Sequence, residues 1–510
     1  MRIVTPKEMN IIDKAMSSEY SMPTSLLMEN AGRAVATYLI QNFKKSTKIL
    51  FITGSGNNGG DGWAAARILF AEGYNVNVVS TCNEIKMSEC TLLNFNIANK
   101  FGLNYTLSAS ESQISDAINE SDIIIDSILG TGISGTVKDN IAQIINLINY
   151  SGKFVIAIDV PSGINAENGT TCGIAVKSDV LITLGTIKQG LLFYPAKNHY
   201  KKLIIEKISI PDILYEKNSS FKSVYCDEEI AEMLHNRSSN SHKGSYGKLG
   251  IIAGSVGMTG AATLCAEAAA RCGTGITELA VPQSLNDILE TKLTEQITRP
   301  MPENENRALK SSRELINFCD NKSALVIGPG LSTNSEGKIF IPEILNIYDK
   351  PIVIDADGLN LIAGNTDILK KGNTVITPHI GEMSRLTGKS IDEITSDMGN
   401  CALEFAQKYN TIVVLKNYIT AIASPSGKLV FNQTGNSGMA TGGSGDVLSG
   451  IIGSLLAQGY RTFDAAVIGT YINGRAAEFA AQNTGTVSLL PSNTAEHIKN
   501  VFIHLYSIKR

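Results

Sequence analysis

The sequence predicts an α/β protein of two domains, each built on its own sheet. Three observations support this prediction. The chain has 510 residues, more than one hydrophobic core usually supports. Short apolar runs alternate with amphipathic segments in the first part of the chain, and the same alternation restarts after a polar stretch near residues 215–225. We therefore place the first domain at residues 1–215 and the second at residues 225–510.

The apolar runs predict the strands of both domains. A helical pattern at residues 25–43 precedes five runs in the first domain, and this spacing of strands by helices predicts a doubly wound parallel sheet. Seven further runs predict a second sheet, which long helical patterns at residues 445–458 and 463–481 follow. The first five runs are residues 48–53, 75–80, 122–128, 153–160 and 179–184, and the other seven are residues 248–254, 275–281, 323–330, 351–358, 374–379, 411–416 and 420–424.

Composition narrows the class of protein. Hydrophobic residues make up 43% and charged residues 18%, and the formal net charge is -4. Nucleic acid and anionic membrane are therefore not expected as partners, because both require clustered Lys and Arg. The eight cysteines are scattered without a C-x-x-C pair, which indicates a reducing compartment. The start has no apolar signal segment and no run reaches the ~18 apolar residues of a membrane span, so we expect a cytoplasmic protein.

A glycine-rich segment, residues 54–62 (GSGNNGGDG), follows the first predicted strand and precedes a helix predicted to begin at Trp63. Glycines allow a backbone to approach an anion closely, and a helix start adds partial positive charge. The segment contains the dinucleotide pattern G-x-G-x-x-G, but the next strand ends in Val78-Val79-Ser80 instead of an acidic residue. An ordinary dinucleotide coenzyme site is thus disfavoured, whereas a phosphate-bearing ligand is not.

Two more strand ends of the first domain carry polar residues. Asp126 precedes a second glycine-rich loop, and Asp159 and Ser162 follow the next predicted strand. Either aspartate taken alone is better explained as a helix cap than as part of a binding site. Because the carboxyl ends of parallel strands meet in one crevice, three such ends together indicate a binding site.

The second domain has its own glycine-rich segment at residues 442–445, directly before Asp446 and a long apolar helix. An acidic residue in a first helical turn is by itself a favourable partner of the helix dipole. Free amides beside a carboxylate that can accept a hydroxyl proton are, however, the minimum equipment for phosphoryl transfer. Gly388-Lys389-Ser390 is no phosphate-binding P-loop, because Met383 stands where the first glycine of that motif is required.

The first domain resembles the epimerase domain of the bifunctional NAD(P)H-hydrate repair enzymes, which is Rossmann-like. Residues 54–62, 126–135 (DSILGTGISG) and 157–169 (AIDVPSGINAENG) carry this resemblance. It implies a potassium ion at Asn58, Asp126 and Ser162, and one carboxylate among three side chains suits a monovalent cation. The resemblance also implies that the hydrated coenzyme is held by Asn57, Asn58, Gly59, Gly60, Asp61, Gly130, Thr131, Gly132, Ile133, Ser134, Gly135, Thr136 and Asp159.

The second domain is similar to the dehydratase domain of the same enzymes, a ribokinase-like α/β/α layer fold. Residues 242–262, 324–332, 353–360, 376–386, 413–422 and the G-S-G-D string at 443–446 carry the similarity. Two departures are Ile380 in place of a proline and Asn417 in place of a glycine. The similarity implies ADP as phosphoryl donor and Mg²⁺. It implies that Ala261, Gly330, His379 and Asp446 face the hydrated coenzyme, and that Lys416, Asn417, Tyr418, Ile419, Thr420 and Gly445 hold the adenine nucleotide.

The chemistry of the two reactions assigns roles to three residues. Inverting C6 of a hydrated nicotinamide requires a general acid and base, for which Asp159 is the best-placed carboxylate. Lys188 is a candidate proton partner, with a solvated surface lysine as the alternative. Dehydration requires a better leaving group than hydroxide, so Asp446 is expected to accept the C6 hydroxyl proton during phosphoryl transfer while Mg²⁺ screens the phosphates.

The sequence therefore predicts a repair enzyme that epimerises NADHX and NADPHX in the first domain and dehydrates the S epimer in the second. We expect a homo-oligomer. His379 judged by itself is more often a structural histidine. The main alternative function is a kinase for a sugar or vitamin alcohol with an accessory nucleotide-binding domain. A first domain that serves only as an interaction module is a further alternative, which the polar residues at its three strand ends disfavour.

Overall fold

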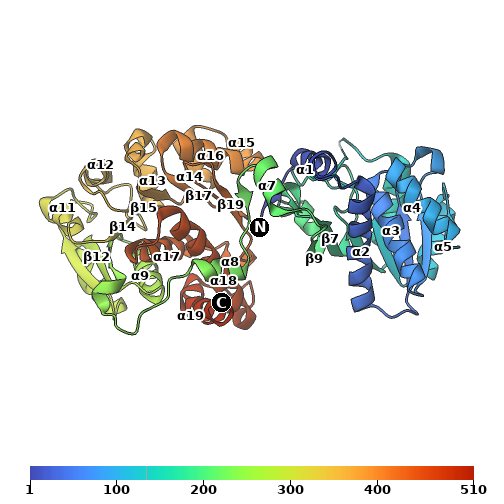
Figure 1. Cartoon of the computed structure of the whole chain (residues 1–510). Helices are drawn as coiled ribbons and strands as arrows, with labels where there is room; N and C mark the ends of the chain where they lie inside the picture. The colour runs from blue at the N-terminus through green and yellow to red at the C-terminus, as the bar shows by residue number, and fades with distance from the viewer. Residues whose placement is uncertain (134, 510) are drawn as a thin grey trace. The chain divides into compact units, whose positions relative to one another are not determined.

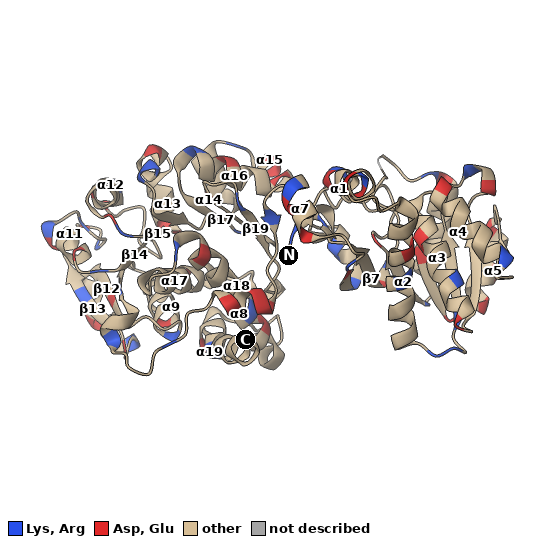
Figure 2. Cartoon of the chain, in the orientation of Figure 1, with Lys and Arg blue, Asp and Glu red and all other residues tan. Residues whose placement is uncertain are grey.

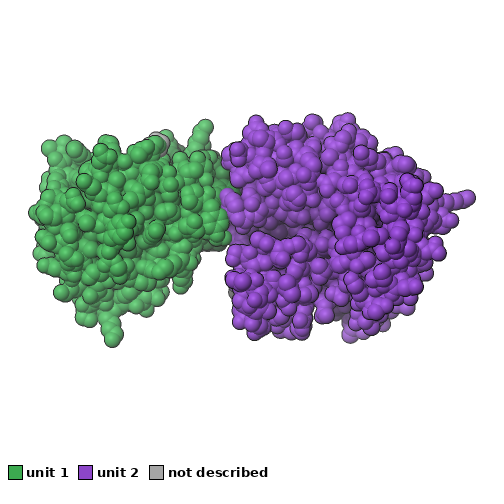
Figure 3. All heavy atoms as spheres, turned by 180° about the vertical axis from the view of Figure 1, so that it is seen from behind, with its two compact units in different colours: residues 1–222 green, residues 223–510 purple. Residues whose placement is uncertain are grey.

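The computed structural model describes residues 1–133 and 135–509 and divides into two compact units, residues 1–222 and 223–510 (Figure 3). Basic and acidic side chains are interspersed along the elements of both units (Figure 2). Among the residues described, no helix is long and apolar enough to cross a membrane.

Unit 1 is built on a sheet of seven parallel strands in the order β4-β3-β2-β5-β6-β7-β9. The prediction of a doubly wound parallel sheet is confirmed, since helices cover both faces (Figure 1). The strands are β2 (Lys48–Thr53), β3 (Asn75–Ser80), β4 (Asn104–Thr106), β5 (Ile123–Ser127), β6 (Phe154–Ile158), β7 (Ser178–Leu184) and β9 (Tyr200–Glu206).

The two faces of this sheet follow from the alternation of side chains along each strand. In β2, Ile49 and Phe51 join one buried cluster, whereas Leu50 and Ile52 join the cluster on the opposite face. The first cluster includes side chains of α1 (Pro6–Glu19), α2 (Thr24–Asn42), α3 (Asn57–Ala71) and α4 (Glu89–Lys100), and the second includes those of α5 (Glu111–Glu120) and α6 (Asp139–Tyr150).

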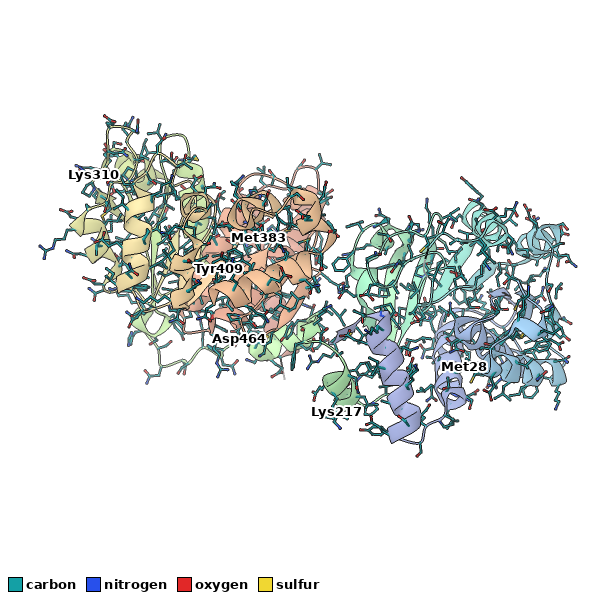
Figure 4. All side chains as sticks on the ribbon, turned by 90° about the horizontal axis from the view of Figure 1, so that it is seen from above. Met28, Lys217, Lys310, Met383, Tyr409 and Asp464 are labelled. Carbon is teal, nitrogen blue, oxygen red and sulfur yellow. The ribbon has the colours of Figure 1, made fainter. Side chains whose placement is uncertain are left out.

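Helix α3 begins earlier than the sequence indicates. It starts at Asn57, so residues 57–61 are helical and are not a loop before Trp63. The glycines explain the difference, because a Cβ at Gly59 would lie 2.0 Å from the Gly54 carbonyl oxygen and one at Gly62 would lie 2.2 Å from Ser127 Oγ. A Cβ at Gly60 would also meet Met28 of α2, which Figure 4 labels. These glycines let the helix start pack directly against the strand ends.

Several elements of unit 1 lie outside the predicted pattern. Helix α1 precedes the predicted first helix, and β4 and β9 form the two edges of the sheet. Strand β1 (Ile3–Val4) pairs in parallel with β8 (Ile187–Lys188), which places Val4 beside Lys188. Helix α7 (Asp212–Asn218) lies at the end of the unit.

Unit 2 contains a mixed sheet in the order β10-β19-β18-β17-β16-β15-β14-β11-β12-β13. Strands β11 to β17 pair in parallel, whereas β17, β18 and β19 pair antiparallel. The strands are β10 (Lys222–Ser223), β11 (Lys248–Ile252), β12 (Ile276–Pro282), β13 (Ile297–Met301), β14 (Ala324–Ile327), β15 (Ile352–Ile354), β16 (Thr374–Ile376), β17 (Ile412–Leu415), β18 (Thr420–Ala423) and β19 (Leu429–Asn432).

Helices cover both faces of this second sheet, giving an α/β/α arrangement (Figure 1). One face packs in a single buried cluster with α8 (Asp227–Met233), α9 (Thr259–Arg271), α17 (Ser444–Ala457), α18 (Thr462–Thr484) and α19 (Pro491–Ile508). The other helices of the unit include α10 (Asn286–Lys292), α11 (Arg313–Cys319), α12 (Gly337–Ile347), α13 (Asp357–Ile362), α14 (Ile380–Thr387), α15 (Ile391–Ser396) and α16 (Met398–Tyr409). The apolar α17 thus lies in the core with only its amino end at the carboxyl ends of the strands.

Candidate functional sites

A buried polar cluster joins three of the strand ends of unit 1. Asp126, the fourth residue of β5, is fully buried and accepts hydrogen bonds from the Ser162 hydroxyl (2.5 Å) and the Ser162 amide (2.8 Å). The Ser162 hydroxyl oxygen also accepts the Leu129 amide at 2.8 Å, and the Asn58 side chain donates to the Leu129 carbonyl at 2.9 Å. The structure therefore brings together Asn58, Asp126 and Ser162, the three residues predicted to hold an ion.

Two features of this cluster fit a monovalent cation. Asn58 Oδ1 is buried and has no hydrogen-bond partner within residues 1–133 and 135–509, although buried amide oxygens normally have one. Burial raises the pKa of Asp126 to about 6, against the effect of its hydrogen bonds from Ser162, so an ionised Asp126 lacks a compensating charge.

Asp159 and Lys188 form an ion pair beside this cluster. Lys188, the last residue of β8, is 1% exposed; its ammonium group donates to Asp159 Oδ1 and to the Leu184 carbonyl oxygen. Lys188 is therefore not a solvated surface lysine. Asp159 follows β6 with φ +66°, a left-handed conformation that is uncommon outside glycine and that occurs often at functional sites.

Asp61 lies within electrostatic reach of this pair. Burial raises the pKa of Asp61 well above its usual value; the negative charge of Asp159 adds to the shift and Lys188 opposes it. Asp61 lies one turn after Asn58 on α3, while the glycine-rich loop after β5 contacts Asn58 through Gly130. Ser134, predicted within that loop, lies outside the described residues. Unit 1 thus has an ion pair and the amino terminus of a helix at the carboxyl ends of its central strands.

In unit 2, Asp446 lies in the first turn of α17, whose N-cap Gly443 has φ +102°. A Cβ at Gly443 would lie 2.8 Å from Leu264 Cδ1, so glycine is required there by conformation and by space. Burial raises the pKa of Asp446 to about 7, and the nearby carboxylate of Asp355 adds to this effect, while Lys416 opposes it. A carboxyl group with this pKa beside free helix amides is suited to proton transfer near neutral pH.

Buried Asp355 and partly exposed Lys416 form an ion pair at the same helix start. Lys416 Nζ donates to Asp355 Oδ1 at 3.0 Å, and Ser449 of α17 donates to Asp355 Oδ2 at 2.6 Å. A Cβ at Gly445 would lie 3.1 Å from Lys416 Nζ, so the ammonium group packs directly on the turn that precedes Asp446. Lys416 thus places its charge at the helix start, and residues 417–420 continue away from it towards β18.

His379 caps helix α14. Its Nδ1 accepts the amide of Gly381 at 3.0 Å, and Glu382 Oε2 accepts the His379 amide at 2.8 Å. Burial, with the positive charges of Lys416 and Arg385, lowers the pKa of His379, which favours a neutral ring protonated on Nε2. The helix begins at Ile380 without the proline common at this position, because proline is favoured at N1 but not required.

The remaining predicted residues of unit 2 lie near the same strand ends. Gly330 has φ +58°, and a Cβ on it would lie 3.0 Å from Ala261 Cβ, so these two residues are neighbours. His379 and Lys416 are paired in a parallel bridge. The structure thus brings Ala261 next to Gly330, and Lys416 next to both His379 and Gly445.

Sequence reasoning missed three acidic residues that act at the two sites. Asp355 and Glu382 influence Asp446 in unit 2, and Asp13 of α1 influences Asp61 in unit 1. Asp355 ends a predicted strand, the signal that identified Asp126 and Asp159. Glu382 lies within the motif of His379 but is explained equally well as the second half of a capping box.

The fold and the two sites define a two-domain α/β enzyme with a Rossmann-like and a ribokinase-like unit, each with a carboxylate near the start of a glycine-rich helix. Comparisons with known proteins agree. The family described as YjeF-related protein N-terminus matches residues 24–190, and the family NAD(P)H-hydrate dehydratase matches residues 249–500.

Relatives align along nearly the whole chain. A bifunctional NAD(P)H-hydrate repair enzyme from Moorella thermoacetica is 35% identical over 99% of this chain and 97% of its own length. A bifunctional NAD(P)H-hydrate repair enzyme from Escherichia coli is 34% identical over 93% of this chain and 89% of its own length. Among solved structures, an ADP/ATP-dependent NAD(P)H-hydrate dehydratase from Bacillus subtilis, co-crystallised with ATP and Mg²⁺, is 26% identical and covers 56% of this chain and 98% of that chain, with a TM-score of 0.48. The chain belongs to the family of bifunctional NAD(P)H-hydrate repair enzymes.

Proposed function

We propose that residues 1–215 interconvert the R and S epimers of NADHX and NADPHX, and that residues 225–510 dehydrate the S epimer with ADP, releasing AMP and phosphate. The observation that carries this proposal is Asp446, a carboxyl group with a pKa of about 7 at the glycine-rich start of a buried helix. Membership of the repair-enzyme family supports the same conclusion.

For dehydration, Asp446 accepts the proton of the C6 hydroxyl as the hydroxyl oxygen attacks the β-phosphoryl group of ADP. AMP leaves, and backbone amides of the turn at residues 442–445 stabilise the charge that develops on the transferred group. The phosphate then leaves C6 while a proton leaves C5, which restores the dihydropyridine ring. His379, whose pKa is lowered by burial, is proposed to face the nicotinamide end of the coenzyme as a neutral ring, without adding a positive charge.

The nucleotide is proposed to bind the main chain of Asn417, Tyr418, Ile419 and Thr420 and the turn at Gly445. Lys416 then contributes its charge near the phosphates, since its ammonium group lies at the helix start. Asp355 and Glu382 are the carboxylates that suit Mg²⁺. Since Mg²⁺ usually keeps few protein ligands and binds substrate phosphates, these two residues suffice, and the ion would offset phosphate charge.

For epimerisation, one group protonates the leaving C6 hydroxyl and another accepts a proton from the water that returns on the opposite face. The carboxylate of Asp159, which is paired with the Lys188 ammonium group, is proposed as the base. A potassium ion at Asn58, Asp126 and Ser162 would supply the positive charge that this buried cluster lacks and would order the adjoining loop. The homo-oligomer and the cytoplasmic location stay predictions.

The test is to analyse the products by ³¹P NMR after incubating the full chain with S-NADHX, ADP and Mg²⁺. We expect inorganic phosphate and AMP in equal amounts, with one NADH formed for each. A kinase for a sugar or vitamin alcohol would instead accumulate a stable phosphate ester and form no NADH from the hydrate. Accumulation of phosphorylated hydrate without NADH would contradict the proposed second step.

A further inference from the structure

The segment between β19 and α17 carries the turn proposed for phosphoryl transfer. It comprises residues 433–443 and ends at Gly443, the N-cap of α17. Within it the chain forms a short 3₁₀ turn, η7 (Ser437–Met439). The backbone amides of residues 442–445 lie where this segment joins the helix, so their position depends on what holds the segment in place.

One face of α18 receives the start of this segment. The Thr434 hydroxyl donates to the Tyr471 carbonyl oxygen at 3.0 Å. The Asn436 side chain donates to the Ala477 carbonyl oxygen, also at 3.0 Å. Between these two contacts, a Cβ at Gly474 would lie 2.3 Å from Thr434 Oγ1 and 2.5 Å from the Thr434 carbonyl carbon. The segment therefore lies directly on the backbone of α18, a close approach that requires glycine.

Glu478, four residues after Gly474 on the same face of α18, holds the segment through its side chain. Its Oε1 accepts the Gly435 amide at 2.8 Å. Gly435 has φ +117°, and a Cβ on it would lie 2.8 Å from Met439 Sδ, so the chain bends here in a way that suits glycine. A carboxylate binds a backbone amide more strongly than a neutral acceptor does, and Glu478 thus fixes the bend.

A chain of polar contacts connects Glu478 to α8. Arg475 donates to Glu478 Oε2 at 2.6 Å and, from its other terminal nitrogen, to Asp227 Oδ1. Asp227 Oδ1 also accepts the Tyr471 hydroxyl at 2.6 Å, and the His504 ring of α19 lies 2.6 Å from Asp227 Oδ2. These contacts hold the Glu478 carboxylate by its second oxygen and leave the first oxygen for the backbone amide.

The second half of the segment packs against the chain that follows α18. A Cβ at Gly438 would lie 2.4 Å from the Thr486 carbonyl oxygen. A Cβ at Gly443 would lie 3.1 Å from Pro491 Cγ, at the start of α19. The segment is thus held at both ends by α18 and by the residues that connect it to α19.

We propose that Glu478 is a positioning residue of dehydration, which sets the turn of residues 442–445 for phosphoryl transfer by holding the Gly435 amide. Arg475 and Asp227 act through Glu478. This inference rests on the proposed dehydratase function. Backbone amides stabilise a transferring group only where they are already in position, and a displacement of about 1 Å can lower the rate by up to about 10²-fold.

The experiment measures ADP-dependent NADH formation from S-NADHX by the full chain, at a temperature where each variant is folded by circular dichroism. Glu478→Ala should lower kcat by about 10- to 100-fold. The KM for ADP should change less, because residues 416–420 are proposed to hold the nucleotide. Glu478→Gln keeps an acceptor for the amide and should restore most of the rate. Glu496→Gln, which removes an exposed carboxylate paired with Lys499 on α19, is the control and should leave kcat unchanged.

Two results separate the possible failures. An unchanged kcat in folded Glu478→Ala, beside an active wild type, would overturn the positioning role. A wild type that forms no NADH would instead refute the proposed function.

A double variant tests whether Arg475 acts through Glu478. Arg475→Met alone should lower kcat, because it releases the second oxygen of the carboxylate. Added to Glu478→Ala, the same substitution should cause no further loss, since the group through which it acts is already absent. Losses that multiply in the double variant would contradict this order of contacts.

Hydrogen exchange followed by mass spectrometry decides the same question without substrate. In the wild type, a peptide that covers residues 434–439 should be protected, and in Glu478→Ala it should exchange faster. A peptide from β17 and β18 should exchange equally in both proteins. Equal exchange of residues 434–439 in wild type and variant would refute the proposal. Complete exchange of these residues in the wild type at the first time point would also refute it, even if Glu478→Ala did not fold.

Discussion

The substitution Asp446→Asn should abolish most of the dehydratase activity while epimerisation persists. Asparagine keeps the size of the side chain but cannot accept the hydroxyl proton. A positioned general base contributes about 10²- to 10⁴-fold, or roughly 3 to 5.5 kcal/mol of transition-state stabilisation. We therefore expect the kcat of ADP-dependent NADH formation from S-NADHX to decrease by about 10²- to 10⁴-fold. Epimer exchange measured without ADP should remain unchanged, because Asp446 belongs to unit 2.

The pH profile adds a second check on this substitution. Since Asp446 acts as an ionised base and burial raises its pKa to about 7, wild-type kcat/KM should rise about tenfold per pH unit below 7 and level off above it. In the Asp446→Asn variant this increase of kcat/KM with pH, the acidic limb of the profile, should be absent. Asp392→Asn, an exposed acidic residue in the first turn of α15, is the matched control and should leave the rate unchanged. Dehydration by the Asp446 variant within a few-fold of wild type would refute the assignment of the base.

Three further predictions concern charge, cation and packing. In Lys416→Met the acidic limb of dehydration should move about one unit to higher pH, because Lys416 holds down the pKa of the base; an unmoved limb in the active variant would exclude this effect. Added potassium should stimulate wild-type epimerisation but not that of Asp126→Ala, and equal wild-type rates with and without potassium would remove the ion from the mechanism. Gly62→Ala should lower the thermal midpoint of unfolding by the equivalent of about 1 to 3 kcal/mol, since the new Cβ would lie 2.2 Å from Ser127 Oγ; Gly260→Ala, in the first turn of α9 with no described atom near the new Cβ, should not.

The central strands of both sheets could be predicted because they are buried on both faces, whereas β10, β13 and β19 of unit 2 were not predicted. Such strands appear as continuous apolar runs, and the predicted residues 48–53 and 75–80 are the observed β2 and β3. Edge strands β4 and β9 lack this signal, as their residues are mostly half-exposed. Helix α1 was missed although its start carries two sequence signals. Thr5 and Glu8 form a capping box, and Pro6 is at N1.

The start of α3 could not be placed from propensity alone. Gly59, Gly60 and Gly62 are poor helix formers, so the pattern indicates a loop up to Trp63. Tertiary packing reverses this preference, because only glycine fits against Gly54 and Ser127. Residues 57–62, which the sequence predicts as a loop, are therefore part of helix α3.

Asp126 and Asp159 were predictable because they lie at strand ends, and Asp446 was predictable because it follows a glycine-rich turn at a helix start. The pairing of Lys188 with Asp159 and of Lys416 with Asp355 depends on how strands are ordered in space, which no local pattern contains.

The extent of repair of an equal mixture of R- and S-NADHX tests the central claim most directly. The full chain is incubated with this mixture, ADP and Mg²⁺, and the absorbance of NADH is followed until it stops changing. The wild type should convert essentially all of the hydrate, because epimerisation feeds the dehydratase. Asp159→Asn should reach about half of that amplitude at an unchanged initial rate and then continue only at the spontaneous rate of epimerisation. A wild type that itself stops at half, or that forms no NADH, would contradict the assignment of two coupled activities to this chain.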